Sequence, residues 1–218
     1  IRIEIDGDLP KGVYAKDVIL TVIGDLRADG ATYKSLEFAG SCVEKMSVSS
    51  RMTMSNMSIE CGAKCALFVP DEKTAAFSGV SLESVSWVKP DPDAHYERVI
   101  YYNAADFVPV VACPSQVDNI HPVSEKAGVK VDEVFLGSCT NGRLEDLAVA
   151  ARILKGKKIA PYVNMIVTPA SRSIYREAIK AGYIETLAEA GAMITQPGCG
   201  LCCGRAGGIL TDGETVLA

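Results

Sequence analysis

The stretch VDEVFLGSCTNGRLEDLAVAARIL, residues 131–154, decides the fold class of this chain. Its apolar run Val134-Phe135-Leu136 predicts a buried strand, and Gly137 and Gly142 predict the turn that follows. From Leu144 to Leu154 apolar side chains recur on one face at helical spacing, which predicts a helix. Strand, glycine-rich turn and helix in this order form the unit from which α/β folds are built.

The same alternation continues toward the end of the chain. Met165-Ile166-Val167 predicts a second strand, which leads to a helix that Ser171 opens as its N-cap. The run from Ala192 to Thr195 predicts a third strand, which ends in a cysteine-rich loop. Strands separated by helices need crossover connections, and such connections give parallel sheets. We therefore predict an α/β fold with largely parallel sheets.

The first half of the chain shows the alternation less regularly. Helices are expected over residues 18–26 and from about Ser49 to Lys64, and a loop or weak helix over 71–92. Strands are expected at residues 1–6, 33–38, 66–69, 98–102 and 108–112. Pro109 predicts a sheet-edge position for the last of these. We place a boundary near residues 110–123, which gives two lobes, 1–112 and 113–218, and the sequence contains no internal repeat.

Composition narrows the class of protein. The 218 residues are 48% hydrophobic and 22% charged, which is enough apolar material for a normal core. The formal net charge is -5 and Lys and Arg do not cluster, so nothing favours nucleic acid or an anionic membrane surface. No apolar run approaches the ~20 residues of a membrane span. A chain of this size needs no disulfides, so its eight cysteines predict a reducing cytoplasm.

Three cysteines carry the most chemical information. Cys139 lies in GSCTNGR, residues 137–143, and Cys199 and Cys202 lie in PGCGLCCG, residues 197–204. Both loops follow predicted parallel strands, so we expect them at the carboxyl edge of one sheet, where ligands bind. Three thiolates leave one coordination position open, which permits Lewis-acid chemistry.

Spacing alone leaves the metal open between structural zinc and a three-cysteine cluster. A closed zinc site needs a fourth ligand, and the adjacent Cys203 cannot easily turn to the metal of Cys202. A thioredoxin-like redox pair would have no use for Cys139. The glycines of both loops would let backbone N–H groups approach cluster sulfides closely.

Four motifs in order resemble a known family. GSCTNGR, PGCGLC (197–202), RMTMSNMSIECGAK (51–64) and the pair AKDVIL (15–20) and DGATY (29–33) are similar to the large subunits of 3-isopropylmalate dehydratases, within the aconitase superfamily. The resemblance covers essentially the whole chain. It implies aconitase-like three-layer α/β/α lobes, and a chain that is a central to C-terminal fragment of a longer subunit.

The resemblance also implies a cofactor and a reaction. Cys139, Cys199 and Cys202 would hold a 4Fe-4S cluster whose fourth iron binds a hydroxy-dicarboxylic acid and withdraws hydroxide in a reversible dehydration. The expected substrate is 3-isopropylmalate, in leucine biosynthesis; homoaconitase, methylmalate and dimethylmalate dehydratases are the alternatives. The family's catalytic histidines and aspartates precede Ile1, a substrate-binding motif follows Ala218, and a separate small subunit supplies the base. The chain alone is therefore expected to be inactive.

Further site residues follow from the same resemblance. Asn56 and Glu60 match residues that face the iron-bound water, and four residues apart they would share a helix face. On spacing alone an exposed polar stripe with Thr53 and Lys64 is the better interpretation, and the motif match favours the functional one. Asn141 and Arg143 could stabilise the cysteine loop or reach a substrate carboxylate.

The remaining candidates receive plainer interpretations. Cys42, Cys61, Cys65 and Cys113 have no motif partner and are expected as small apolar core residues. His95 and His121 are expected on surface loops, and Cys203 as a packing residue or a surrogate ligand. Two other functions stay open at this point. One is a non-catalytic zinc module, and the other is a redox sensor that uses Cys202 and Cys203.

Overall fold

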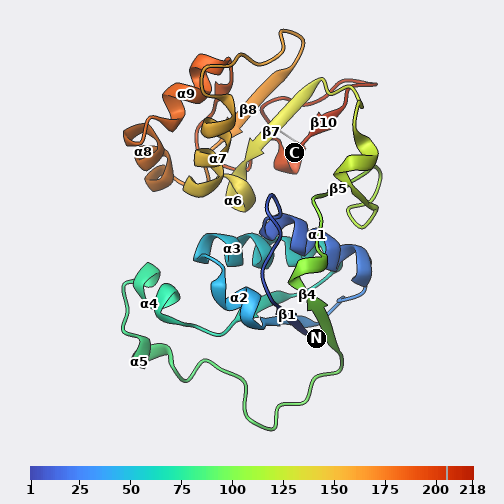
Figure 1. Ribbon diagram of the computed structural model, residues 1–218, viewed down its shortest axis with the longest axis vertical. Coiled ribbons are helices and arrows are strands. Elements are labelled where there is room, and N and C mark those ends of the chain that lie inside the picture. The colour runs from blue at the N-terminus through green and yellow to red at the C-terminus, as the bar shows by residue number, and fades with distance from the viewer. Residues whose placement is uncertain (205) are drawn as a thin grey trace. The chain divides into compact units, whose positions relative to one another are not determined.

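The computed structural model describes residues 1–204 and 206–218, which form two compact units, Ile1–Ala127 and Gly128–Ala218 (Figure 1). Each unit has its own parallel sheet and its own hydrophobic core. The division lies after Ala127, whereas the sequence analysis placed it after Ala112. The difference arises because β5 (Val110–Ala112) pairs antiparallel with β6 (Ile120–Pro122), and this hairpin packs against the first unit's α1.

The first unit is built on four parallel strands in the order β3-β2-β1-β4. The strands are β1 (Arg2–Asp6), β2 (Ser35–Ala39), β3 (Cys65–Phe68) and β4 (Val99–Asn103). Alternation along β1 and β2 buries Ile3, Ile5, Leu36 and Phe38 in the core. The intervening residues of β1 are polar, and Arg2 donates to Glu4 and Glu37. The sheet therefore has one apolar face and one polar face.

Helices cover the apolar face. Helix α1 (Ala15–Leu26) buries a stripe that includes Val18, Ile19, Val22 and Ile23, as the sequence predicted. The short α2 (Ser41–Lys45) leads to α3 (Val48–Met57), which Ser47 caps by accepting from the Ser50 amide.

The second expected helix ends earlier than predicted. Helix α3 stops at Met57 and continues only as the 3₁₀ turn η1 (Ser58–Cys61), not as an α-helix to Lys64. Gly62 follows with φ of 85°, a left-handed conformation that ends the helical path. The Cys61 carbonyl accepts from the Ala31 amide, 2.9 Å away, so the turn is anchored outside the helix. A helical pattern in sequence cannot reveal such a tertiary anchor.

The rest of the first unit connects the sheet to the hairpin. The predicted loop or weak helix over 71–92 contains two short helices, α4 (Glu72–Ser78) and α5 (Leu82–Val85). After β4 come η2 (Ala104–Asp106), the hairpin and η3 (Val123–Lys126). Pro109 directly precedes β5, whose pairing partner is β6, so the predicted edge position is confirmed. Gly24 of α1 lies against the hairpin, because a Cβ at this position would be 3.0 Å from the side chain of Ile120 in β6.

The second unit repeats the alternation that the sequence showed most clearly. Strands β7 (Glu133–Gly137), β8 (Asn164–Thr168), β9 (Met193–Ile194) and β10 (Val216–Leu217) form a parallel sheet in the order β10-β7-β8-β9. Helices α7 (Leu144–Leu154), α8 (Arg172–Lys180) and α9 (Tyr183–Ala190) gather on one side of it (Figure 1). Ser171 caps α8 as predicted, accepting from the Ile174 amide. The core centres on Leu147, Val167 and Leu187.

The two sheets share one strand order. In each, the first three strands of the unit lie side by side in succession, and the fourth strand pairs on the other side of the first. The point where the order reverses lies between β1 and β4 in one unit and between β7 and β10 in the other. Crevices at such reversals bind ligands in open α/β sheets. The sequence shows no repeat, yet the connectivity recurs.

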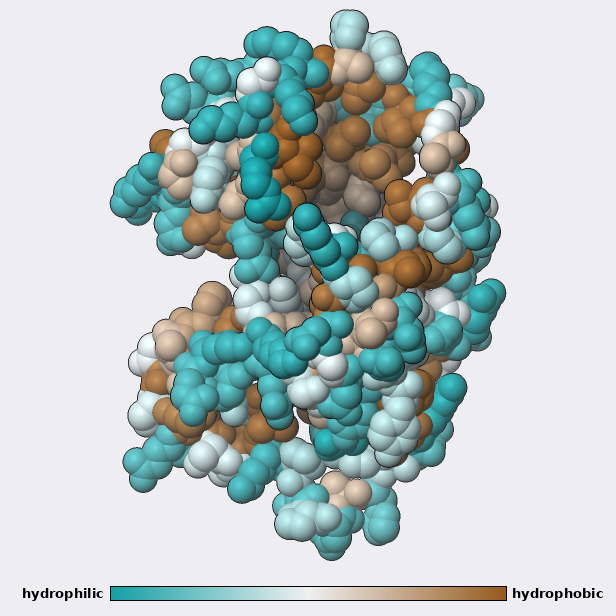
Figure 2. Space-filling view, in the orientation of Figure 1, coloured by the Kyte–Doolittle hydropathy of each residue, from teal (hydrophilic) through white to brown (hydrophobic). Residues whose placement is uncertain are grey.

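One face of the second sheet carries many hydrophobic residues (Figure 2). In Figure 2 hydrophobic residues gather over β7, β8 and β10 on the face turned to the viewer. Near the C-terminus, Ile209 is 60% exposed and Leu217 of β10 is 48% exposed. Within the described ranges, no helix has both the length and the apolar character that a membrane crossing requires.

Candidate functional site

Cys139 stands on a sharp turn between strand and helix. Strand β7 ends at Gly137, and the short helix α6 (Ser138–Asn141) begins directly after it. Ser138 is 2% exposed and has a φ of 61°, a left-handed conformation that is costly for a residue with a side chain. This strained elbow exposes Cys139 at the carboxyl end of β7. The neighbouring glycine is required, because a Cβ at Gly137 would lie 2.5 Å from the Thr168 carbonyl oxygen.

Arg143 and Asn141 brace the Cys139 loop from within. The Arg143 guanidinium donates to the Cys139 carbonyl from Nη2 at 2.9 Å and from Nε at 3.2 Å. Asp146 accepts from the Arg143 amide at 2.9 Å and from Asn141 Nδ2 at 3.1 Å. Burial raises the pKa of Asp146, and these two hydrogen bonds oppose that shift. Asn141 and Arg143 were expected either to stabilise the cysteine loop or to reach a substrate carboxylate. Their hydrogen bonds in the structure are those of the first role.

The second cysteine loop returns to the same strand ends. It contains η4 (Gly200–Cys203), and Cys199, Cys202 and Cys203 are all exposed. Gly200 adopts a φ of 54°, and a Cβ there would lie 2.9 Å from Thr168 Oγ1 and 3.3 Å from the Phe135 ring. Phe135 belongs to β7 and Thr168 ends β8. The loop therefore lies beside β7, the strand that leads to Cys139, as the sequence predicted.

The Cys203 thiol contacts the backbone of its own turn. Its Sγ lies 3.5 Å from the Gly200 carbonyl oxygen, within its own turn. The Cys202 amide meanwhile donates to the Cys199 carbonyl at 3.1 Å, which closes the turn between these two cysteines. The tight turn brings the backbones of Cys199 and Cys202 together, while the Cys203 thiol contacts the turn's own backbone.

The donor set suits a metal centre, although the side chains do not converge. All eight cysteines lie in the described part of the chain, and none of them forms a disulfide. The three candidate thiols are exposed on two loops at one sheet edge, with glycine backbone around them. Across residues 1–204 and 206–218, however, no three His, Cys, Asp or Glu side chains stand close enough together to hold one metal ion. The chain supplies the ligand types and brings their loops together.

Asn56 and Glu60 lie in the first unit. Both are exposed, Asn56 in the last turn of α3 and Glu60 in η1. They therefore do not share one continuous α-helical face, because the α-helix ends between them. Thr53, which could have extended a polar stripe, is 3% exposed, and its hydroxyl donates to the Ser49 carbonyl. The alternative of a continuous solvent-facing stripe from Thr53 to Lys64 is wrong.

The amino end of the first sheet carries this pair, contrary to the usual placement of sites. Three residues separate turn η1 from β3, and the Lys64 amide donates to the Lys34 carbonyl just before β2 begins. Lys64 Nζ lies 4.3 Å from the centre of the Tyr33 ring, a cation–π contact. Tyr33 is 82% exposed and has a φ of 61°. Glu60 thus lies four residues before Lys64, whose ammonium group is held at an exposed aromatic ring.

The other cysteines and histidines mostly follow expectation. Cys42 and Cys61 are buried, and burial raises the pKa of both thiols. Cys113 is half-buried, but Cys65 is exposed on β3, so the core assignment is wrong for Cys65. It fails because an alternating strand turns every second residue outward.

Both histidines lie away from the core, as expected. His95 is exposed in the segment before β4, and His121 lies in β6 rather than in a loop. Its ring nitrogens contact Glu125 at 3.1 Å and Asn119 at 3.2 Å. These contacts tie the hairpin to the η3 turn.

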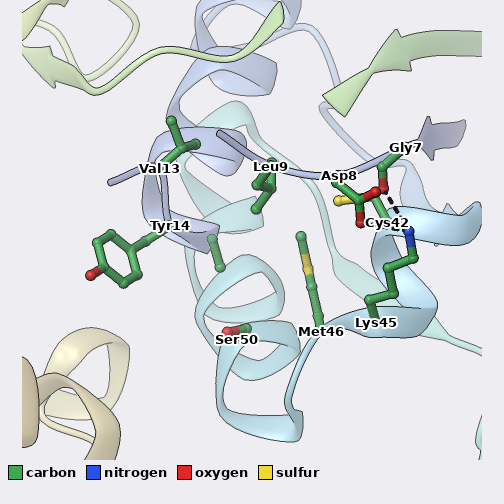
Figure 3. A pocket seen from close by; sticks show the side chains of 10 residues that line it. Gly7, Asp8, Leu9, Val13, Tyr14, Cys42, Lys45, Met46 and Ser50 are labelled. Carbon is green, nitrogen blue, oxygen red and sulfur yellow. Dashed lines mark hydrogen bonds and ion pairs between the residues drawn. The ribbon is translucent and has the colours of Figure 1, made fainter. Parts of the chain in front are cut away.

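A cavity of about 220 Å³ lies elsewhere in the first unit (Figure 3). Its lining includes Leu9, Val13, Tyr14 and Met46. Lys45 points to its rim, where the ammonium group lies 2.6 Å from Asp8. The carboxylate neutralises the one lysine of the lining, so this cavity offers no net positive charge to an anion. It shares no residue with the two cysteine loops.

Sequence reasoning missed two buried polar residues of the second sheet. Glu133 is 6% exposed at the start of β7, and its Oε1 has no hydrogen-bond partner among the described residues. Thr168 is fully buried, and its hydroxyl lies 2.6 Å from the Thr195 hydroxyl. The only sequence signal was a polar residue in a strand, which normally indicates the solvent face.

Replacing Glu133 by Gln should stabilise the protein in a pH-dependent way. Burial and repulsion from Glu214 raise the pKa of Glu133, so the folded state disfavours the carboxylate. The penalty is absent below the unfolded-state pKa, near 4.5, and grows as pH rises above it. We expect Glu133→Gln to raise the free energy of unfolding in urea by ~1 kcal/mol at pH 7.5, and so to raise the urea midpoint, and to leave both unchanged at pH 4. Glu145→Gln, on exposed helix surface, is the control. A lower midpoint at pH 7.5 would contradict the prediction.

Comparison with known proteins defines the class to which this fold and site belong. The chain belongs to the aconitase family, whose sequence profile, described as aconitate hydratase, matches residues 1–128 and 125–218. A solved structure, the holo-form of Thermococcus kodakaraensis aconitase X, shows a similar fold, with a TM-score of 0.50 at 15% identity over 91% of this chain and 44% of that one. The α/β class predicted from sequence is confirmed.

Curated relatives narrow the resemblance within the family. The chain is 52% identical over 219 residues to the 3-isopropylmalate dehydratase large subunit 2 of Archaeoglobus fulgidus. This match covers 100% of this chain and 53% of that protein. It is 49% identical over 220 residues to the probable methanogen homoaconitase large subunit of Methanosarcina mazei, over 100% of this chain and 55% of that protein. The chain therefore spans about half the length of the curated relatives it matches.

Proposed function

We propose that this chain is part of the large subunit of an iron–sulfur hydro-lyase that reversibly dehydrates a hydroxy-dicarboxylic acid. The observation that carries the proposal is identity of 45–52% over 98–100% of the chain to proteins named as large subunits of 3-isopropylmalate dehydratase. The placement of both cysteine loops at one sheet edge supports it. The first substrate to test is 3-isopropylmalate, which would place the protein in leucine biosynthesis.

Cys139, Cys199 and Cys202 are the residues that would hold a 4Fe-4S cluster. When bound, such a cluster supplies a Lewis-acidic iron with an open coordination position. Arg143 and Asn141 act on the protein side, because they brace the backbone that bears Cys139. Thiols held without disulfides suit a reducing compartment, so a cytoplasmic location belongs to the proposal.

Proton transfer falls to Glu60. Its exposed carboxyl group would give a proton to the departing hydroxyl oxygen of the substrate, and the carboxylate would take a proton back from water in hydration. The Asn56 amide, exposed one turn earlier, would orient that same oxygen. Because the relatives are named large subunits, the proposal includes a small-subunit partner that completes the site.

Metal analysis tests the proposal most directly. After anaerobic reconstitution we expect about four irons and four sulfides per chain, with a broad visible absorption band. Cys139→Ser should lose both iron and band, whereas Cys65→Ser, at an exposed cysteine of the first unit, should keep them. Zinc alone, or iron binding that is indifferent to Cys139, would refute the cluster and favour the non-catalytic zinc module. Reversible Cys202–Cys203 disulfide formation without iron would favour the redox sensor.

Homoaconitase chemistry is the second candidate, because one relative at 49% identity bears that name. Both substrates are hydroxy acids with several carboxylates, so the same cysteines and Glu60 would serve either. Comparing kcat/KM for 3-isopropylmalate and homocitrate, with large and small subunits together, decides between them. The substrate with the higher kcat/KM identifies the enzyme.

A further inference from the structure

Thr168 is the residue on which both cysteine loops converge. It ends β8, is fully buried, and belongs to neither loop. Its backbone faces the Cys139 loop, since a Cβ at Gly137 or at Gly142 would lie 2.5 Å from the Thr168 carbonyl oxygen. Its side chain faces the other loop, since a Cβ at Gly200 would lie 2.9 Å from Thr168 Oγ1. Three glycines thus permit close approach to one residue from two directions.

Hydrogen bonds hold the end of β8 against both cysteine loops. The Ala170 amide, two residues after Thr168, donates to the Gly142 carbonyl at 2.9 Å and so ties the end of β8 to the Cys139 loop. The Thr168 hydroxyl lies 2.6 Å from the Thr195 hydroxyl, at the point where β9 gives way to the loop of Cys199 and Cys202. The Thr195 amide also donates to the Val167 carbonyl at 2.9 Å. The end of β8 around Thr168 is therefore hydrogen-bonded to both loops.

We propose that Thr168 is a positioning residue that sets the spacing between Cys139 and the Cys199–Cys202 pair. This inference rests on the proposed function, because the spacing matters only if the three thiols share one cofactor. Thr168 acts through the glycines that pack on it. Ligating groups must be held within about 0.5 Å of their working geometry, and buried contacts of this kind supply that precision.

Substitutions of Thr168 test the contact between its side chain and the loop of Cys199 and Cys202. Thr168→Val replaces the hydroxyl by a larger methyl group, which crowds Gly200 and leaves the Thr195 hydroxyl without its partner. Thr168→Ser keeps the hydroxyl and should restore the parent behaviour. Thr186→Val is the matched control, because the Thr186 hydroxyl donates to the carbonyl of Gly182, the N-cap of its own helix α9.

Glycine substitutions test the contact between the Thr168 backbone and the Cys139 loop. Gly142→Ala would place a Cβ 2.5 Å from the Thr168 carbonyl and 2.7 Å from the Ser138 carbonyl. Gly198→Ala is its control, because the nearest atom to a Cβ there is the Gln196 carbonyl oxygen at 4.0 Å. Gly198 also adjoins Cys199, so the control perturbs the cysteine loop without touching Thr168.

Cross-linking of the iron-free chain measures the spacing itself. A bifunctional methanethiosulfonate is added to the anaerobic chain, and mass spectrometry quantifies the peptide pair that joins Cys139 to Cys199. We expect Thr168→Val and Gly142→Ala to lower that yield about tenfold, with Thr168→Ser, Thr186→Val and Gly198→Ala near the parent. Circular dichroism confirms that each variant is folded. Parent-like yields in folded Thr168→Val would overturn the proposal, and if that variant is unfolded, Gly142→Ala decides by the same criterion.

A second readout connects the spacing to the cofactor. In reconstituted chains, iron loss to a chelator should be about tenfold faster in Thr168→Val than in the parent and in Thr186→Val. If the parent binds no iron, the proposed cluster fails while the cross-linking result still decides the role of Thr168. If the parent binds four irons and Thr168→Val retains them equally well, the positioning role fails while the proposed function stands.

Discussion

Glu60→Gln is expected to lower kcat of the complete enzyme, large and small subunits together, by a factor of roughly 100 or more. Gln has nearly the shape of Glu but cannot give or take a proton at the departing oxygen. Glu60 is exposed on the turn after α3, so the substitution removes no buried contact. Iron and sulfide content should stay at the parent value, because Glu60 is in a different unit from the three cysteines.

The control for Glu60→Gln is Glu83→Gln. Glu83 is exposed in the first turn of the short helix α5, in the same unit and of the same residue type. It should leave kcat unchanged. A Glu60→Gln enzyme as active as its parent would show that the proton-transfer role is misassigned. A loss of iron together with activity would show that Glu60 supports folding or assembly instead of chemistry.

Arg51→Met is expected to destabilise the first unit by about 3–5 kcal/mol. The Arg51 side chain is 6% exposed and pairs with Asp71 at 2.5 Å. It also donates to the carbonyls of Val43 and Glu44, so one guanidinium connects α2, α3 and the start of α4. Asp71 in turn caps α4 by accepting from the Thr74 amide. Met keeps the length of the side chain, but it removes the cation that pairs with Asp71 and one donor from each of the two carbonyls.

Chemical denaturation at pH 7 measures this loss, and Lys45→Met is the control. Lys45 pairs with Asp8 at 2.6 Å, and the two side chains are 56% and 81% exposed. Its removal should leave the free energy of unfolding close to that of the parent, as is usual for exposed pairs. An equal, small effect of both substitutions would show that the buried pair contributes no more than a surface one.

The Arg51–Asp71 pair also gives a pH dependence of fixed sign. The Arg51 guanidinium lowers the pKa of Asp71 well below its usual 3.8. Because the folded-state pKa lies below the unfolded one, the stabilisation is present above pH ~4 and is lost as pH falls through the folded-state pKa. The gap in unfolding free energy between the parent and Asp71→Asn should therefore narrow below pH 4. A gap that widens in acid would contradict this assignment.

The period of apolar residues predicted most of the fold, and tertiary contacts explain its errors. Alternation and helical spacing are local properties, so they located the strands β1 to β4 and β7 to β9 and the helices α1, α7 and α8, but not the two-residue strand β10. The helix after Ser49 was predicted too long because its end depends on Gly62 and on the Ala31 amide, which is remote in sequence. The boundary was placed too early because a hairpin belongs to whichever core it packs on.

By itself the sequence determined that this chain is an α/β protein with parallel sheets and that its two cysteine loops lie at the same sheet edge, because strand direction follows from crossover connections. It also determined the family, through four ordered motifs. Only the tertiary structure decided that Glu133 and Thr168 are buried and that Thr168 joins both loops. Burial and close approach arise from packing between segments that are distant in sequence, and a single residue's type carries no record of that packing.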